Sequence, residues 1–163
     1  GMALSFIQIP IFPPAPYLQY DPSGIVTLTV ALMYGPAAGI MVQLVSWIPK
    51  LIMSPLGSLL TFVAMIGAVL IVGLIYKKFH NLKGAIVAIV VGSVVFTAIA
   101  IAMNFVITPI YTPGVTVEAV ASMVVPILLP FNISKCTING VVTGLLYKPV
   151  SNLVKMRDSR AHA

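Results

Sequence analysis

The sequence predicts an all-α integral membrane protein, a bundle of six transmembrane helices of which the first is incomplete in this chain. Of the 163 residues 60% are hydrophobic and only 7% are charged, whereas soluble domains carry roughly 25% charged residues. Several apolar runs reach the length of about 20 residues that a membrane span needs. The few cations stand at the ends of these runs, where they act as topology determinants. We therefore expect a single membrane domain, residues 1–163, with a basic cytoplasmic tail at 155–163.

The individual helices follow from the apolar runs and from their breaks. The opening residues are too few to span before Pro10, so we expect them to be the end of a first helix. The pair Gly35-Pro36 divides the next run, because proline suits the first turn of a helix and disfavours helix before it. The expected helices are Met2–Ile9, Ser23–Tyr34, Pro36–Met53, Leu56–Tyr76, Leu82–Ile107 and Asn132–Val154, with a shorter helix at Val117–Leu129 that ends at Pro130.

Lysine and arginine predict the orientation of the bundle. The last two long spans form a hairpin, so the cations that flank it share one side, which is the cytoplasm by the positive-inside rule. These cations are Lys77, Lys78, Lys83, Lys148, Lys155, Arg157 and Arg160. The connections Ile9–Asp21, Lys50–Pro55 and Thr108–Thr116 then lie outside, with Lys50 as the one exception to the rule. The proline-dense first connection suits a lid over a cavity and a plain surface connector equally well.

Three polar residues in or beside the apolar runs are candidate functional residues. A charge at the centre of a membrane span costs about 2.5–3.5 kcal/mol on insertion scales, so such residues are rare and usually functional. Asp21 precedes Pro22 and could instead cap a helix N-terminus. Asn104 could instead form an interhelical hydrogen bond. Lys135 follows Asn132, the expected N-cap of the last helix, where a cation opposes the helix dipole; its alternative is snorkelling to the outer headgroups.

Asn104 and Lys135 fall at a similar outer depth on adjacent antiparallel helices. We therefore expect them to converge on one outward-facing pocket. Three aromatic residues at this depth could flank a flat ligand there, or could be ordinary interfacial aromatics. They are Phe105, Phe131 and Tyr111.

Several classes of function are excluded. The net charge of +6 rests on twelve charged residues at segment ends and does not indicate nucleic-acid binding. The sequence has no Gly-rich phosphate loop and no HExxH motif, and no catalytic triad or metal site is evident. Three acidic residues are too few for a carboxylate relay through the membrane. Cys136 is the single cysteine, so no intramolecular disulfide forms. The chain is predicted to bind or pass a ligand, not to be an enzyme.

Three stretches carry a family resemblance. Tyr17–Ser23, with Tyr34–Gly39 after it, is similar to a first outer loop and its following helices. Met103–Tyr111 and Leu129–Lys135 are similar to the exit of a fifth helix and the entry of a sixth. From Phe12 to Val154 the chain resembles the substrate-binding S-components of energy-coupling-factor (ECF) vitamin transporters, most closely their riboflavin-specific type.

The resemblance implies a multi-pass S-component of a bacterial or archaeal cell membrane that captures riboflavin or a related flavin from outside. Asn104 and Lys135 match the residues that hydrogen-bond the flavin ring, and Thr61 lies across the same pocket. The resemblance also implies partners, namely a scaffold membrane subunit and two ABC-type ATPase subunits, which alone use ATP. No cofactor of its own is implied, and transport occurs by toppling in the bilayer.

The chain departs from the family pattern at Gly24, at Gly57–Phe62 and at Cys136. At the first two places polar residues of the family are missing, and at the third a glycine is replaced. Two alternatives therefore remain open at the level of the sequence. One is an S-component for a different vitamin or small planar ligand. The other is a structural membrane subunit that binds no ligand.

Overall fold

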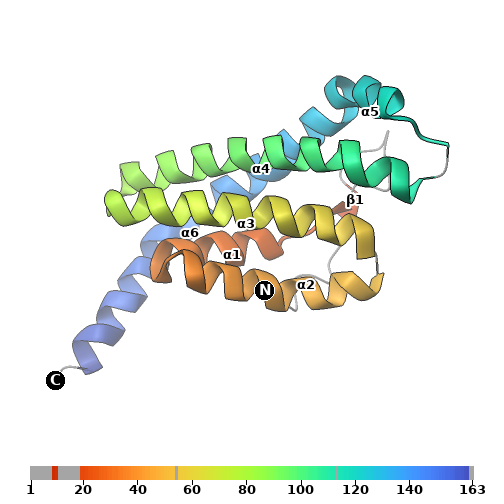
Figure 1. The fold of residues 1–163 in the computed structure, drawn as a ribbon. Helices are drawn as coiled ribbons and strands as arrows, with labels where there is room; N and C mark the ends of the chain where they lie inside the picture. The colour runs from red at the N-terminus through yellow and green to blue at the C-terminus, as the bar shows by residue number, and fades with distance from the viewer. Residues whose placement is uncertain (1–8, 11–18, 54, 113, 162–163) are drawn as a thin grey trace.

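The structure, a computed structural model, describes residues 9–10, 19–53, 55–112 and 114–161. Its long helices run roughly along one axis, with a short helix at one end (Figure 1). In chain order the elements are β1 (Ile9–Pro10), β2 (Gln19–Tyr20), α1 (Ser23–Tyr34), α2 (Pro36–Met53), α3 (Pro55–Lys78), α4 (Leu82–Tyr111), α5 (Val117–Met123), a π-helical turn η2 (Val124–Leu128) and α6 (Leu129–Ala161).

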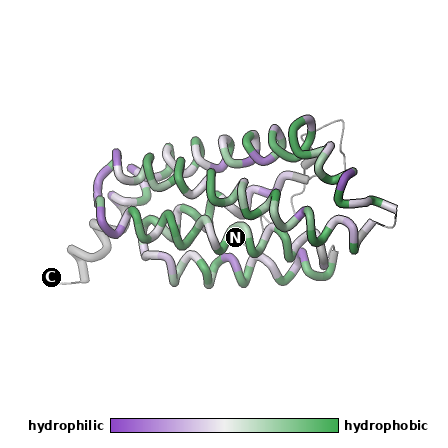
Figure 2. The backbone as a smooth tube through the Cα atoms, turned by 45° about the horizontal axis from the view of Figure 1, so that its top comes forward, coloured by the Kyte–Doolittle hydropathy of each residue, from purple (hydrophilic) through white to green (hydrophobic). Residues whose placement is uncertain are grey.

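The all-α membrane class is confirmed. Three helical stretches are long and apolar enough to cross a membrane, namely Gly57–Lys78, Leu82–Ile110 and Val117–Asn152. Shorter apolar helices cover Ser23–Tyr34 and Pro36–Ile52. Apolar residues occur all along the helices (Figure 2), and many large ones point outward. An apolar exterior of this kind is stable in lipid and would be costly in water.

The six-helix count is met only roughly. Five long helices, α1 to α4 and α6, are present in the described part of the chain, together with the short α5. The expected first helix, Met2–Ile9, lies outside the described residues except for Ile9, which pairs with Tyr20 between the antiparallel strands β1 and β2. The expected bounds of α1 and α2 match the structure, with Gly35 at φ +90° in the corner between them.

Several expected helix bounds are wrong. Helix α6 begins at Leu129 and ends at Ala161 instead of covering 132–154, and α3 ends at Lys78 instead of Tyr76. Two further differences lie at prolines. Helix α4 continues past Pro109 to Tyr111. A proline near a helix end is tolerated because it removes only one backbone hydrogen bond. The Thr112 N–H closes the final turn by donating to the Thr108 carbonyl. The shorter helix does not stop at Pro130 either. The π-helical turn η2 carries Pro126, and the Leu129 N–H reaches back to the Val124 carbonyl, so the chain continues into α6 without a break.

Small residues bring the central helices close together. Helices α3 and α4 meet along buried alanines, and Gly92 of α4 faces Val72 of α3 where a side chain would clash. Helices α1 and α2 pack against α3, and α6 packs against α1 and α4. Close approach through small residues is the usual way in which membrane helices gain packing energy. The same packing leaves a polar region at one end of the bundle, where α1 begins and α2 ends.

We expect Gly73→Ala to destabilise the bundle. A methyl group at this position would lie 2.7 Å from ring carbons of Pro36 and 2.8 Å from its nitrogen, so the corner between α1 and α2 must move away from α3. Overpacking of this kind costs about 1–3 kcal/mol. The measurement is the thermal unfolding midpoint in detergent. Gly144→Ala is the control because nothing lies within 4 Å of the added methyl group. Equal midpoints for the two variants would contradict this packing.

Candidate functional site

A buried ion pair ties the start of α1 to the end of α2. Lys50 Nζ lies 2.7 Å from Asp21 Oδ2 and donates to Ser23 Oγ at 2.9 Å. Asp21 Oδ1 accepts from both the Ser23 N–H, at 2.9 Å, and the Ser23 hydroxyl. The side chains of Lys50 and Asp21 are only 8% and 9% exposed. Each charge therefore has hydrogen-bonded partners, which a buried charge requires.

These positions correct two expectations. Lys50 lies inside helix α2 and not in a loop, and its ammonium group pairs with the Asp21 carboxylate. Asp21 is not the N-cap residue, since Pro22 occupies that position and α1 begins at Ser23. Its carboxylate nevertheless accepts the first N–H of the helix. Asp21 thus stabilises the helix start and belongs to the charged cluster.

Asp21 precedes the first helix and has a perturbed pKa. Burial raises the pKa of the Asp21 carboxyl. The charges of Lys135 and Lys50, and the hydrogen bonds from Lys50 and Ser23, lower this pKa by more. The net result is a pKa below the usual value of an aspartate. The ionised carboxylate therefore contributes stability that is fully present above about pH 4, the pKa in an unfolded chain. This stability is lost as the pH falls through the lower pKa of the folded protein.

We therefore expect the wild-type protein to lose thermal stability on acidification below about pH 4. The double variant Asp21→Leu/Lys50→Met has no carboxylate to protonate at this position, so its unfolding midpoint should depend less on pH in the same range. The measurement is the midpoint in detergent at a series of pH values. Parallel loss of stability in both proteins would show that Asp21 does not titrate as described.

Lys135 is the second cation of this region. It is 4% exposed, and its Nζ lies 5.5 Å from the centre of the Phe96 ring on α4. Its charge acts on Asp21. Within the described part of the chain its Nζ makes no hydrogen bond below 3.5 Å. Lys135 is therefore buried and does not snorkel to the headgroups.

The helix context of Lys135 also differs from the expectation. Asn132 is not an N-cap, because α6 begins at Leu129 and the Asn132 side chain donates to the Leu128 carbonyl at 2.7 Å. The helical chain continues from Val117 through Lys135, so the lysine lies well inside a span and not in a first turn. The dipole argument does not apply there, since the effect fades within the first turn.

Sequence reasoning missed several polar residues that surround this cluster. Gln43 and Ser46 share one face of α2 with Lys50, and Asn139 and Thr143 share one face of α6 with Lys135. All are buried. Thr27 donates to Gln43 at 3.1 Å, and the Tyr20 hydroxyl donates to Asn139 Oδ1 at 2.8 Å. The signal that could have found them is their helical spacing of three or four residues, which gathers polar groups on one face.

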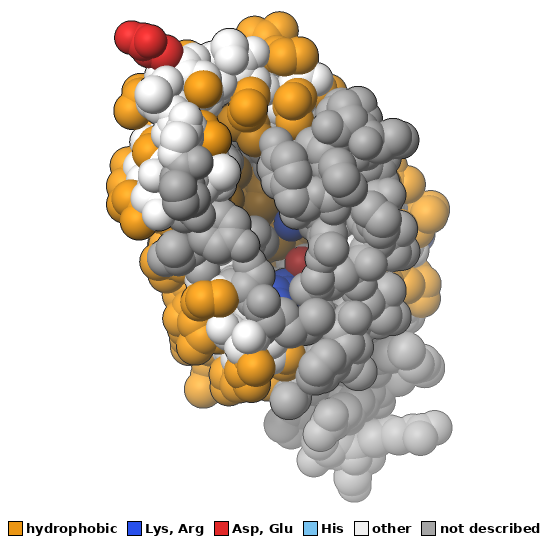
Figure 3. All heavy atoms as spheres, turned by 90° about the vertical axis from the view of Figure 1, so that its right-hand side faces the viewer, with side chains coloured by type: hydrophobic (Ala, Val, Ile, Leu, Met, Phe, Trp, Pro, Cys, Tyr) orange, Lys and Arg blue, Asp and Glu red, His pale blue; other side chains and the backbone are white. Residues whose placement is uncertain are grey.

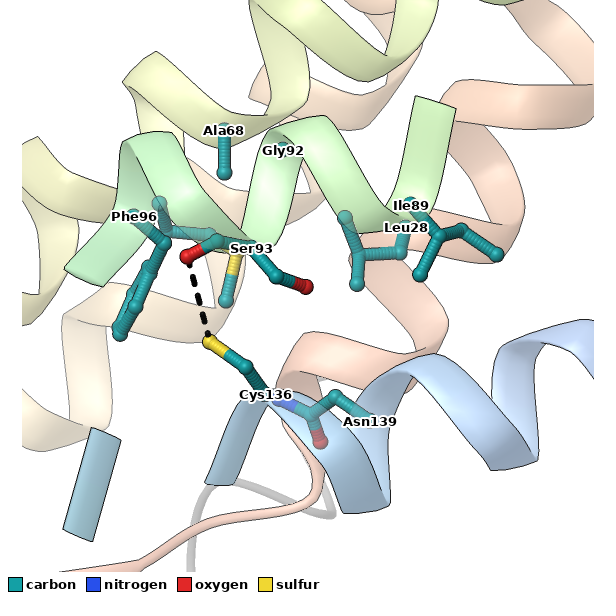
Figure 4. A pocket seen from close by; sticks show the side chains of 9 residues that line it. Leu28, Ala68, Ile89, Gly92, Ser93, Phe96, Cys136 and Asn139 are labelled. Carbon is teal, nitrogen blue, oxygen red and sulfur yellow. Dashed lines mark hydrogen bonds between the residues drawn. The ribbon is translucent and has the colours of Figure 1, made fainter. Parts of the chain in front are cut away.

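A small cavity lies beneath the cluster, between α1, α3, α4 and α6. Its volume is about 20 Å³, room for about one water molecule. Figure 4 shows Phe96, Cys136 and Asn139 around it, with the Cys136 thiol donating to the Ser93 carbonyl at 3.7 Å. The cavity is too small for a vitamin-sized ligand. A hollow opens at this end of the bundle, with acidic and basic side chains visible at its base (Figure 3).

The remaining predicted site residues lie near this end of the bundle, on α3, α4 and α6. Asn104 is half-buried on α4, and its amide donates to the Ala100 carbonyl at 2.7 Å and accepts from Thr108 at 2.9 Å. It stands eight residues, or about 12 Å, beyond Phe96 along the helix axis. Thr61 is half-buried on α3 and donates to the Gly57 carbonyl at 3.4 Å.

Among the predicted aromatics, Phe131 is buried on α6 and Phe105 is half-buried on α4. Tyr111 is the last residue of α4, and its side chain lies outside the described part of the structure. The described residues contain no group of three His, Cys, Asp or Glu side chains that could hold a metal ion. The site offers ammonium, amide and hydroxyl groups beside aromatic rings. Such groups can bind a planar solute by hydrogen bonds and stacking.

An apolar helix bundle with a buried, charged and hydrogen-bonding region at one end defines a solute-binding membrane protein. Comparison with known proteins makes the class specific. Residues 1–147 match the family described as "ECF transporter, substrate-specific component". The chain belongs to this family, and the resemblance found in the sequence is confirmed. Because the family is a transporter component, the prediction that the chain is not an enzyme is confirmed as well.

Two curated relatives and one solved structure are similar over nearly the whole chain. The riboflavin transporter RibU of Staphylococcus aureus (strain TCH60) is 31% identical over 163 residues, 95% of this chain and 86% of the relative. The riboflavin transporter FmnP of Bacillus subtilis (strain 168) is 31% identical over 172 residues, 98% of this chain and 90% of the relative. The solved structure of the S component of a bacterial ECF transporter superposes with a TM-score of 0.78 at 31% identity, covering 94% of this chain and 90% of that one.

Proposed function

We propose that this protein captures riboflavin or a related flavin as the substrate-binding subunit of an ECF-type vitamin importer. Both curated relatives are named riboflavin transporters. The observation that carries the proposal is the buried Lys135 ammonium, which lies over the Phe96 ring. A flavin ring is flat and aromatic and carries carbonyl and nitrogen acceptors along one edge, so it complements an ammonium group set among aromatic side chains.

The charge balance of the cluster supports this ligand class. Lys50 and Lys135 both act on the carboxylate of Asp21, and among the described residues the ion pair of Asp21 is with Lys50. We propose that the flavin edge accepts from Lys135 and Asn104, that Phe105, Phe131 and Tyr111 flank the ring, and that Asp21 and Thr61 border the pocket. Asn104 would exchange its present bond to Thr108 for one to the ligand.

The charges at the two ends of the bundle support a proposed orientation in the membrane. Lys77, Lys78 and Lys83 gather at the turn between α3 and α4, and Tyr147, close to Lys148, hydrogen-bonds Tyr76 at that same end. We propose that this end faces the cytoplasm of a bacterial cell and that the Asp21 end opens outward. A scaffold membrane subunit and two ABC-type ATPases would supply the energy, and toppling of this chain would carry the pocket inward.

The experiment is to purify the protein from riboflavin-containing cells and to extract and identify the bound ligand by mass spectrometry. The proposal predicts a yellow preparation, and quenching of flavin fluorescence when riboflavin is titrated into emptied protein. A colourless protein with no titratable flavin binding would refute the ligand and leave the family membership untouched. A different extracted vitamin would assign the same pocket to that compound.

A further inference from the structure

A second hollow lies at the opposite end of the bundle from the Asp21–Lys50 pair. Helix α3 connects the two ends over 24 residues, about 36 Å. The hollow is a groove with a volume of about 490 Å³ between the corner of α1 and α2, the end of α3, and α6. Its size is within the range of ligand pockets in general. The vitamin site described above does not use any of its residues.

The groove has one apolar part and one polar part. Leu32, Met33 and Pro36 supply the apolar part from α1 and the start of α2. The polar part comes from Tyr34, Tyr76, Lys77, His80 and Ser151. Tyr76 is held in place, because its hydroxyl shares a hydrogen bond of 2.9 Å with that of Tyr147 and its ring lies 5.2 Å from the His80 ring. The polar part thus combines a tyrosine held in place with a lysine, a histidine and further hydroxyl groups.

We propose that this groove binds an anionic phospholipid of the adjacent leaflet. The groove lies where the span Gly57–Lys78 ends, which is the depth of the headgroups. The phosphate accepts hydrogen bonds from Lys77 and Tyr34, and an acyl chain lies against Met33 and Pro36, which line the groove and are only partly buried. Other lysines at this end, Lys78, Lys83 and Lys148, raise the local concentration of anionic lipid. Charge and amphipathic shape together select a phospholipid over a soluble anion.

The experiment measures lipid binding to the purified full chain by native mass spectrometry and by thermal shift. The probes are dioleoyl phosphatidylglycerol, dioleoyl phosphatidylcholine and inorganic phosphate. We expect phosphatidylglycerol to remain bound and to raise the unfolding midpoint more than phosphatidylcholine does. Lys77→Gln should weaken phosphatidylglycerol binding at least about tenfold, because a hydrogen bond from a charged group to the phosphate is lost. Ser151→Phe, which fills the groove without changing charge, should weaken it as well.

Lys83→Gln is the matched control, since it removes the same charge at the same end from outside the groove. Its phosphatidylglycerol affinity should fall no more than about fivefold, because only diffuse attraction is lost and the groove contacts are intact. Equal losses in Lys77→Gln and Lys83→Gln would overturn the site in favour of diffuse attraction. Equal stabilisation by phosphatidylcholine, or by inorganic phosphate alone, would overturn the assignment to an anionic lipid. Riboflavin binding is measured in parallel and is expected to be unchanged, so this test is independent of the proposed function.

Discussion

Asp21→Ala is expected to lower the free energy of unfolding by about 3–5 kcal/mol, the range for removing one partner of a buried ion pair. The substitution leaves the Lys50 and Lys135 ammonium groups buried without their shared carboxylate. It also removes the acceptor for the Ser23 N–H at the start of α1. The measurement is the thermal or denaturant-induced unfolding of the purified protein in detergent.

Glu118→Ala is the control for Asp21, because Glu118 is an exposed carboxylate in the first turn of α5. Its loss should cost less than about 1 kcal/mol. The double variant Asp21→Leu/Lys50→Met should recover part of the lost stability, since an apolar pair replaces the ion pair, while Lys135 still lacks its counter-charge. An Asp21→Ala protein as stable as wild type would contradict the role assigned to this cluster.

Lys135→Met is expected to separate binding from stability. Methionine keeps much of the side-chain length and removes a buried charge, so the fold should be as stable as wild type or more stable. The free energy of riboflavin binding should become less favourable by about 1.5–3 kcal/mol, the value of a hydrogen bond from a charged group. This corresponds to a loss of affinity of roughly ten- to 150-fold. The measurement is a fluorescence-quenching titration beside an unfolding curve.

Lys148→Met is the matched control, an exposed lysine of the same helix at the opposite end of the bundle. Its riboflavin affinity should equal that of wild type. If Lys135→Met bound riboflavin with unchanged affinity, Lys135 would have to be removed from the site. If affinity fell only together with stability, the lysine would be a structural residue.

Much of the fold could be predicted from the sequence, because lipid makes the length and apolar character of a run nearly sufficient to define a helix. Helix ends were less predictable at Pro109 and Pro130. A proline usually ends a helix, yet α4 tolerates one near its end, and α6 begins after a π-helical turn that accommodates Pro126. Whether a helix tolerates a proline depends on neighbouring packing, and a single sequence does not carry that information.

The site was predictable only where a charge interrupts an apolar run. Lys135 stood out for this reason, and the structure buries it. For Lys50 the sequence predicts both a helix that contains it and an outer connection that begins at it, because a sequence gives no depth for a residue near a helix end. Its partner Asp21 lies 29 residues away. The sequence does not indicate Asn139 as a site residue, because an amide in a span has no net charge. Its bond to Tyr20 joins residues 119 positions apart, and sequence spacing does not reveal such a pair.

The central claim is that the hollow around Lys135 holds the ring of a flavin. A crystal structure of the protein with bound riboflavin tests it most directly. We expect an acceptor atom of the ring edge about 2.7–3.2 Å from Lys135 Nζ, with the ring among the aromatic side chains of α4 and α6. A flavin bound elsewhere in the bundle, or oriented with its ring edge away from Lys135, would contradict this binding site.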